Sequence, residues 1–275
     1  MDIKNFDVKN KTYIMGILNV TPDSFSDGGS WNGVEAASEH ARRMAFEGAD
    51  IIDVGGESTR PGYTPVSDEE EIRRVVPVIK RIKAELDIPV SVDTCKAKVA
   101  RAALEAGADM VNDIWGFKKD DDMARAAAEY GAVCCLMHNR ADTEYSSFVL
   151  DVKRDLQESV NIALRAGVKE ENIILDPGIG FAKSPEQNLI ILNKLEELYM
   201  GYPILVGASR KSLIGYALKL PVSRREEASV AAAVIAAYKG AAFVRVHNVA
   251  AHRHAVDMAR AVANSGKNQN KGASR

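Results

Sequence analysis

Residues 50–93 read DIIDVGGESTRPGYTPVSDEEEIRRVVPVIKRIKAELDIPVSVD. This stretch begins and ends with short apolar runs, Asp50–Gly55 and Pro89–Asp93, whose length is typical of buried strands. The stretch therefore predicts a strand, a helix and a second strand in succession. The helix is expected over Ser67–Leu86, where apolar residues recur at helical spacing: Ile72, Val75, Val76, Ile79 and Ile82.

Capping sequences mark the starts of two helices. Ser67 is followed three residues later by Glu70, and Ser184 is followed at the same spacing by Gln187. In this pattern the serine and the Glu or Gln side chain satisfy N–H groups that the first turn leaves unpaired. Pro77 lies inside the first of these helices, where it is expected to remove a hydrogen bond and cause a kink.

The alternation of apolar run and helical segment continues along the chain. Continuous apolar strands indicate a parallel sheet buried on both faces, because a half-exposed sheet would alternate apolar and polar residues. Eight such units predict an α/β protein with a single (β/α)8 TIM barrel and a parallel eight-stranded core. An open doubly wound sheet is the alternative fold. The runs are Tyr13–Val20, Asp50–Gly55, Pro89–Asp93, Met110–Ile114, Ala132–His138, Ile173–Asp176, Pro203–Gly207 and Phe243–His247.

The length of 275 residues suits one domain, since barrels of this kind routinely use roughly 250 residues. No linker or shift in composition divides the chain, so we expect a single domain over residues 1–264. Residues 265–275 are polar, contain glycine and lack periodicity, and a disordered tail is expected there.

Charge and cysteine content exclude several classes of protein. The 36 Lys and Arg side chains against 38 Asp and Glu give a net charge of -2, which gives no reason to expect binding to nucleic acid or a membrane surface. No apolar run approaches the roughly 18 residues of a membrane span. Three cysteines, two of them adjacent, make a disulfide framework implausible and suit a reducing compartment. We therefore expect a cytoplasmic protein.

Several reactive residue types are interpreted as structural. Cys134 and Cys135 lie in an apolar run with no activating base nearby, so they are expected to be small core residues. His40, His252 and His254 fall on expected helices and are interpreted as surface residues. The glycine pairs of the chain lack the spacing of a dinucleotide-binding or Walker motif. Nothing here favours a nucleotide-dependent enzyme.

In a (β/α)8 barrel the functional site lies at the C-terminal ends of the strands. The polar residues that close the apolar runs are therefore the candidates for a site. Asp, Asn and Ser are also preferred helix caps, so any single one could instead be a cap. Eight runs that all end in this way favour a site. The candidates are Asn19, Asp53 with Glu57, Asp93, Asn112 with Asp113, His138, Asp176, Ser209 to Lys211, and Arg245 with His247.

Asp93, Asn112 and Asp176 could together grip a heterocycle. They end the third, fourth and sixth expected strands and would converge at the barrel mouth. A carboxylate can accept two parallel N–H bonds from an aminopyrimidinone, and an amide can donate or accept. Asp176 suits the bidentate role, because the glycines that follow it allow a sharp turn. The same three residues could instead hold a divalent metal, although no dedicated metal motif is present.

A second group of strand-end residues is cationic and would suit an anion such as a phosphate. For residues in exposed loops, above all Arg60, solvated surface charges are the alternative interpretation. That alternative is weaker for Arg245, because an unpaired charge in an apolar strand is costly. The group comprises Arg60, Arg210, Lys211, Arg245 and His247.

Several motifs occur in order over nearly the whole chain: NVTPDSFSDGG at 19–29, DVGGESTRPG at 53–62, NDI at 112–114, DPGIGF at 176–181 and SRKS at 209–212. Together they resemble the dihydropteroate synthase family. The resemblance implies a barrel enzyme, usually a homodimer, of folate synthesis. It implies that 6-hydroxymethyl-7,8-dihydropterin pyrophosphate is joined to 4-aminobenzoate with release of pyrophosphate, that Mg2+ takes part, and that sulfonamides compete.

The resemblance also implies roles for individual residues. The pterin-binding residues would be Asp93, Asn112, Asp176 and Lys211. The pyrophosphate would meet Asn19, Thr59, Arg245 and His247, with Asn19 also near the metal ion. The aminobenzoate pocket would comprise Phe25, Arg60, Pro61, Phe181, Lys211 and Ser212. Catalysis would rest on Asp27, Arg60, Lys211, Arg245 and His247. Ala208 and Asn248 depart from the usual family pattern.

These assignments suggest a dissociative reaction, in which the C–O bond to pyrophosphate breaks before the amine attacks. Arg245 and His247 would then meet the departing anion, while Asp27 would face the cation. Because two long loops carry much of the aminobenzoate pocket, we expect 4-aminobenzoate to bind only after pyrophosphate. A pterin-binding, corrinoid-dependent methyltransferase is the alternative enzyme. A barrel that binds pterin without catalysis is a third interpretation.

Overall fold

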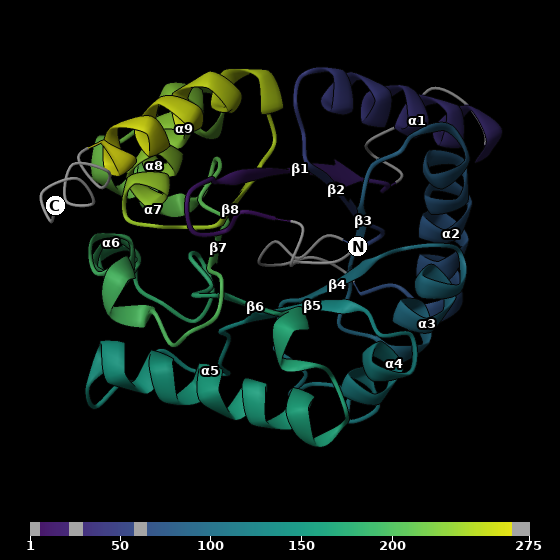
Figure 1. Ribbon diagram of the computed structural model, residues 1–275, viewed down its shortest axis with the longest axis horizontal. Coiled ribbons are helices and arrows are strands. Elements are labelled where there is room, and N and C mark those ends of the chain that lie inside the picture. Colours follow the sequence, from purple (N-terminus) through teal and green to yellow (C-terminus); the bar gives the residue numbers. More distant parts are fainter. Residues whose placement is uncertain (1–5, 22–29, 58–64, 266–275) are drawn as a thin grey trace, which may run out of the picture.

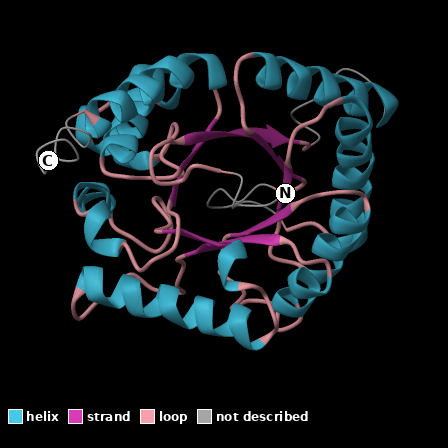
Figure 2. Ribbon diagram, in the orientation of Figure 1, coloured by secondary structure: helices cyan, strands magenta, loops and turns pink. Residues whose placement is uncertain are grey.

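The computed structural model describes residues 6–21, 30–57 and 65–265. Eight parallel strands form one sheet in the order β6-β5-β4-β3-β2-β1-β8-β7, and an isolated parallel bridge between Leu175 and Ile204 joins its two ends. Figure 2 shows the strands as a ring surrounded by helices. The expected (β/α)8 barrel is confirmed. The strands are β1 (Tyr13–Asn19), β2 (Ile51–Gly55), β3 (Val90–Asp93), β4 (Met110–Asp113), β5 (Val133–Met137), β6 (Ile173–Asp176), β7 (Leu205–Val206) and β8 (Phe243–Val246).

Helices cover the outside of the ring, and at least one follows each strand (Figure 1). Ser67 caps α2 by accepting a hydrogen bond from the Glu70 N–H, and Ser184 with Gln187 forms a complete capping box on α6. The helices are α1 (Ser30–Phe46), α2 (Asp68–Glu85), α3 (Ala97–Glu105), α4 (Met123–Glu129), α5 (Phe148–Arg165), α6 (Pro185–Asn193), α7 (Ser212–Leu218), α8 (Glu226–Tyr238) and α9 (Val249–Asn264). In the described part of the chain, 3-10 helices lie at Glu170–Asn172, Leu195–Leu198 and Val222–Arg224.

Inside the barrel, the side chains nearer the N-terminal ends of the strands are apolar, and those nearer the C-terminal ends are polar. One buried apolar cluster fills the inside of the barrel and includes Ile51, Met110, Ile174 and Phe243. Because side chains on a strand alternate between its two faces, the residue two positions later also points inward, one level nearer the C-terminal end. On the four even-numbered strands these second residues are Asp53, Asn112, Asp176 and Arg245. The fold thus places four polar side chains, one from every second strand, in a single layer above an apolar floor.

Two structural interpretations of the sequence can be compared with the packing. Cys134 and Cys135 are buried, as expected, and burial raises the pKa of both thiols above the usual range. The surface interpretation of His252 is wrong. Its ring is buried on the face of α9 that also carries Val249 and Val256, and its Nδ1 lies 2.6 Å from the Asn248 carbonyl oxygen. His252 has the i+3 and i+4 spacing to these apolar residues that defines the inward face of a helix.

The length and polarity of a helix decide whether it could span a membrane. Within the described ranges, every helix is too short or too polar to cross a membrane. Ser265 ends the described part of the expected tail, and residues 266–275 lie outside it. The single-domain boundary at residue 264 stays a prediction.

Candidate active site

The polar layer is held together by Asp53. Its Oδ2 accepts a hydrogen bond from Arg245 Nε at 2.6 Å and another from Asn112 Nδ2 at 3.2 Å. Arg245 also donates from Nη2 to Asp93 Oδ2, at 2.7 Å. The Asp53 side chain is fully buried, and that of Arg245 is 18% exposed. The guanidinium therefore bridges two buried carboxylates across the mouth of the barrel.

This pairing changes the electrostatics of the mouth. Burial acts to lower the pKa of Arg245, but Asp53 and Asp93 together hold it above its usual value. Burial raises the pKa of Asp93 to about 7, although Arg245 opposes that shift. Asp53 Oδ1 and Asp93 Oδ1 are buried without a hydrogen-bond partner among the described residues. Buried acceptors of this kind suit a ligand that brings its own N–H donors.

Asp53 is a site residue to which sequence reasoning assigns no role. It is among the polar residues that close the apolar runs, but its partner Arg245 lies 192 residues further along the chain. The available signal is its position two residues after Ile51, which places it on the inner face together with the other members of the layer. By fixing the Nδ2 side of the Asn112 amide, Asp53 leaves the Asn112 oxygen to face other groups.

Asp176 ends β6, and a tight loop follows it. Its Oδ1 accepts a hydrogen bond from the Gly178 N–H at 2.7 Å. Gly178 has a φ of +70°, and a Cβ there would lie 2.0 Å from the His138 carbonyl oxygen, so only glycine fits. Burial raises the pKa of Asp176, and Lys211 opposes that shift. The sharp turn expected beside Asp176 is confirmed.

Lys211 reaches from the start of α7 to the loop after β6. Its Nζ donates to the Ile179 carbonyl oxygen at 2.5 Å and lies 4.8 Å from the centroid of the Phe181 ring. Burial lowers the pKa of Lys211 to about 8, against the opposing effect of Asp176. Ser212, the next residue, is exposed. The fold thus brings Phe181 to Lys211, which interacts electrostatically with Asp176.

The residues expected at the anion lie on the neighbouring strands β1 and β8. His247 follows β8, and its Nδ1 lies 3.0 Å from Ser209 Oγ. Asn19 ends β1 at the same rim, where a Cβ on Gly55 would lie 3.7 Å from Asn19 Oδ1 and 3.8 Å from Asp93 Oδ2. The anion candidates therefore lie next to the polar layer.

Arg210 does not belong to the expected cationic group. Its backbone has a φ of +58°, and its exposed side chain pairs with Glu226 of α8 at 3.0 Å. With this left-handed backbone, the Arg210 side chain reaches Glu226, whereas the Lys211 side chain reaches Ile179. Because its side chain pairs with Glu226, the interpretation of Arg210 as part of an anion site is wrong. Sequence spacing alone could not reveal this ion pair.

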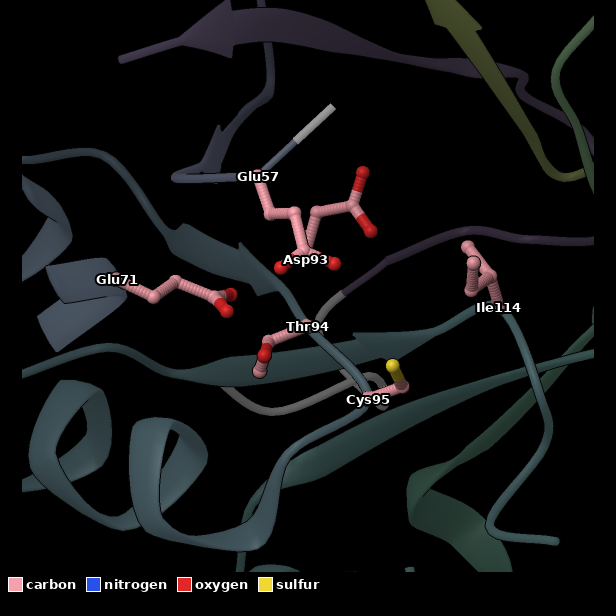
Figure 3. Close-up of a pocket in the computed structure, with 6 residues that line it drawn as sticks. All are labelled: Glu57, Glu71, Asp93, Thr94, Cys95 and Ile114. Carbon is pink, nitrogen blue, oxygen red and sulfur yellow. The ribbon is translucent and has the colours of Figure 1, made fainter. Parts of the chain in front are cut away.

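Two further acidic side chains, Glu57 and Glu71, line a small cavity together with Asp93. Glu57, Glu71, Asp93, Thr94, Cys95 and Ile114 line a cavity of about 10 Å³, room for one water molecule (Figure 3). Lys96 Nζ lies 2.7 Å from both Glu57 Oε2 and Glu71 Oε2 and donates to the Val66 carbonyl oxygen at 2.8 Å. Glu57 also accepts the Val66 N–H at 2.8 Å. This ion cluster ties Glu57 to Val66, and the two residues lie on opposite sides of residues 58–64 in the sequence.

Some expected site residues lie outside the described ranges. They are Phe25, Asp27, Thr59, Arg60 and Pro61. Among the residues that are described, no three His, Cys, Asp or Glu side chains gather to form a metal site. The described part of the candidate site comprises the polar layer, Asp93, the pair of Lys211 and Phe181, and the expected anion residues Asn19 and His247.

Comparisons with known proteins agree with this geometry. The sequence model of a family described as pterin binding enzyme matches residues 15–247. The dihydropteroate synthase of Clostridium beijerinckii is 62% identical over 257 residues, covering 93% of this chain and 96% of the relative. The crystal structure of a Clostridium difficile dihydropteroate synthase in the presence of pteroic acid has a TM-score of 0.91 and 50% identity, covering 94% of this chain and 98% of that one.

A further solved structure carries the second expected ligand. The Xanthomonas albilineans dihydropteroate synthase with 4-aminobenzoic acid has a TM-score of 0.87 and 45% identity, covering 92% of this chain and 93% of that one. Family match, high identity and near-complete coverage therefore lead to the same conclusion as the motifs. The chain belongs to the dihydropteroate synthase family of pterin-binding enzymes.

Proposed function

We propose that this chain joins 6-hydroxymethyl-7,8-dihydropterin pyrophosphate to 4-aminobenzoate, giving 7,8-dihydropteroate and pyrophosphate. The observation that carries the proposal is the polar layer of Asp53, Asn112, Asp176 and Arg245, whose buried acceptors have the depth and polarity that a flat aminopyrimidinone needs. Relatives of the same family support it. The reaction is a transfer of a pterinylmethyl group in folate synthesis.

The pterin would lie on the polar layer. Asp176 would accept N–H bonds from the amino and ring nitrogens, and Asn112 would offer the oxygen that Asp53 leaves available. Asp93 and Lys211 would complete the pterin contacts at the rim. Burial raises the pKa of Asp93 to about 7, and the Arg245 guanidinium opposes this shift and so favours the ionised form.

The pyrophosphate would lie toward β1 and β8. Arg245 and His247 would stabilise charge on the departing anion, as would Thr59. With Asp53 and Asp93 already on its Nε and Nη2, Arg245 would serve the pterin and the anion at once. Arg245 would lie between the pterin and the pyrophosphate. The same guanidinium would then contribute both to pterin binding and to cleavage of the C–O bond.

A Mg2+ ion fits the donor set at this rim. Asn19 offers an amide oxygen near Asp93, and Mg2+ usually keeps several waters and binds through substrate phosphates, so a multi-carboxylate cage is not required. Asn19 would hold the ion together with the pyrophosphate oxygens. When bound, Mg2+ supplies neutralisation of negative charge on the leaving group.

The reaction would be dissociative. The pterin methylene C–O bond breaks with its electron pair going to pyrophosphate, the aminobenzoate nitrogen then forms a bond to the methylene carbon, and the amine loses a proton. Aminobenzoate is a free amine at neutral pH, so no strong base is required. Phe181, Lys211 and Ser212 would bind it together with Phe25, Arg60 and Pro61, while Asp27 would face the cation. A sulfonamide would compete for this pocket.

We also propose a cytoplasmic homodimer. An apolar groove runs between α8 and α9, and its lining includes Ile235, Tyr238, Met258 and Val262. Tyr238 is 58% exposed and Met258 is 64% exposed, a large apolar contribution for the surface of a monomer. A second copy of the chain would bury this groove. The buried, unpaired cysteines suit a reducing compartment.

Product analysis tests the proposed function. Purified chain is incubated with the pterin pyrophosphate, 4-aminobenzoate and Mg2+, and in a parallel reaction with methyltetrahydrofolate and a corrinoid protein. We expect dihydropteroate in the first reaction and no methyl transfer in the second. Methyl transfer without dihydropteroate would favour the corrinoid-dependent methyltransferase instead.

The order of ligand binding stays a prediction. The described part of the aminobenzoate pocket is limited to Phe181, Lys211 and the exposed Ser212, too few contacts for tight binding on their own. We expect calorimetry to detect aminobenzoate binding only when Mg2+ pyrophosphate and a pterin mimic are present. Aminobenzoate should then tighten pyrophosphate binding by the same factor. Equal affinity for aminobenzoate in the free and the saturated protein would contradict the prediction.

The activity should fall at alkaline pH because Lys211 loses its proton. Since its pKa is lowered to about 8, the ammonium form is present below this pH and lost above it. We expect kcat/KM for aminobenzoate to decrease as the pH rises through about 8. Lys211→Arg should shift this limb to higher pH, because arginine stays charged. An alkaline limb that Lys211→Arg leaves in place would assign it to another group.

A further inference from the structure

The loop between β6 and α6 carries two expected ligand contacts, Asp176 at its start and Phe181 near its end. Its backbone takes positive φ at Gly178, Gly180 and Ala182. For alanine this left-handed conformation costs on the order of 1 kcal/mol, so side-chain contacts must hold the loop. The Gly178 N–H donates to Asp176 Oδ1, so the position of the loop also sets the orientation of that carboxylate.

Lys183 lies near the end of this loop, and its side chain turns back to bind the earlier residues of the loop. Its Nζ donates to the carbonyl oxygens of Gly178, at 3.2 Å, and of Phe181, at 3.1 Å. The third contact is with His138 Nδ1, at 2.7 Å. Lys183 is 9% exposed. An ammonium group has three N–H donors, so this geometry uses every one of them.

A histidine and a carboxylate continue the chain of hydrogen bonds outward. Because Nδ1 of His138 accepts from Lys183, its Nε2 carries the proton and donates to Asp155 Oδ2, at 3.1 Å. Asp155 Oδ2 also pairs with Arg140 Nε at 3.1 Å. Burial and the charge of Lys183 lower the pKa of His138 to about 2, so the ring is neutral. The Lys183 cation of the loop is thus linked to a carboxylate on α5.

A buried cation at this position is costly. Burial lowers the pKa of Lys183 to about 7, although Asp176 and Asp155 oppose the shift. Lys211 and Lys118 are the other charged groups that act on it, and both lower its pKa. An apolar side chain of similar volume would avoid that desolvation cost. The lysine is therefore explained better by the two loop carbonyls that it holds than by stability.

We propose that Lys183 is a positioning residue: acting through the Gly178 and Phe181 carbonyls, and supported by His138 and Asp155, it sets the Asp176 carboxylate and the Phe181 ring for the two substrates. The pyrophosphate candidates Asn19 and His247 lie on other strands and are not held by it. The inference rests on the proposed function for its ligands. The effect of Lys183 on the loop between β6 and α6 does not depend on that function.

Lys183→Met tests the proposal, because methionine keeps the apolar stem and removes the charge and all three donors. We expect the Kd for the pterin and the KM for aminobenzoate each to rise at least about tenfold, with Kd for Mg2+ pyrophosphate within about twofold of wild type. Hydrogen exchange should accelerate at the amides of Gly178, Gly180 and Phe181, all of which donate hydrogen bonds.

Lys118→Met is the matched control. Lys118 is also a lysine whose pKa burial lowers, and it contacts the Asp155 carbonyl oxygen at 3.5 Å, but it holds no loop carbonyl. Its substitution should leave the affinities and the loop exchange unchanged. If Lys183→Met does not fold, Asp155→Asn provides the test with a change of one atom, and it should raise the same two constants by about threefold.

The outcomes separate the inference from the function on which it rests. Wild-type protein that forms no dihydropteroate contradicts the proposed function, whereas loop exchange in the variants still tests the role of Lys183. Pterin and aminobenzoate constants within twofold of wild type, with unchanged exchange in the loop, would overturn the inference. A lowered Tm with intact ligand affinity would likewise assign Lys183 to stability alone.

Discussion

Asp176→Asn is expected to lose pterin affinity by roughly 150-fold, about 3 kcal/mol. The Asp176 Oδ1 atom already accepts the Gly178 N–H, so an asparagine would place its oxygen there and turn its NH2 toward the pterin. Two donor groups would then face each other in a buried site, where each is left unpaired. Calorimetric titration with 6-hydroxymethylpterin measures the loss directly.

Asp151→Asn is the control for this substitution. Asp151 is also buried and also accepts backbone N–H groups, from Ser146 and Ser147, but it lies at the start of α5, outside the barrel. Its substitution should leave pterin affinity unchanged. Pterin affinity of Asp176→Asn within about tenfold of wild type, roughly 1.4 kcal/mol, would show that Asp176 does not make the bidentate contact.

Arg245→Gln is expected to lower the free energy of unfolding by about 3 kcal/mol and to weaken pterin and pyrophosphate binding together. The substitution leaves the Asp53 and Asp93 carboxylates close together without a counter-charge. The sequence alone suggests that Arg245 touches only the anion, and its two carboxylate contacts revise that expectation. Urea denaturation and calorimetry with each ligand measure the two effects.

The pH dependence of this variant has a definite sign. The folded-state pKa of Asp93 is raised to about 7, so its protonated form favours folding and this contribution is lost as the pH rises through that value. Without Arg245 the Asp93 carboxylate loses the cation that chiefly opposes the rise in its pKa, so the loss of stability should be larger at pH 8 than at pH 6. A loss that is independent of pH would contradict this explanation.

Two further variants locate the effect. Arg253→Gln is matched, because the Arg253 side chain is also 18% exposed and pairs with two carboxylates, Asp50 and Asp257, which are themselves more exposed. It should cost less than 1 kcal/mol or so. Adding Asp53→Asn to Arg245→Gln removes one uncompensated charge and should restore part of the stability.

The barrel could be predicted from sequence because its causes are local. A run such as Ile173–Asp176 is apolar throughout, since both faces of a parallel strand are buried, and Ser184 with Gln187 marks a helix start within four residues. Part of the candidate site could be predicted from the same apolar runs, because the polar residue that ends a strand lies at the barrel mouth.

The remaining features depend on contacts between distant residues. Asp53 is bonded to a guanidinium 192 positions away, and Lys183 to a histidine 45 positions away. Neither pairing leaves a pattern in the local sequence. The direction of Arg210 depends on a single left-handed φ, which next to Lys211 cannot be inferred from residue type. His252 is different, since its helical phase with Val249 and Val256 was sufficient to indicate burial.

Release of pyrophosphate from 6-hydroxymethyl-7,8-dihydropterin pyrophosphate, followed with and without 4-aminobenzoate, tests the central claim most directly. With Mg2+ and both substrates, the account predicts one pyrophosphate for each dihydropteroate formed, and competition by a sulfonamide. Without 4-aminobenzoate, pyrophosphate release should be slow and should yield no pteroate. Absence of pyrophosphate release in the presence of both substrates, from protein that binds the pterin, would contradict the account.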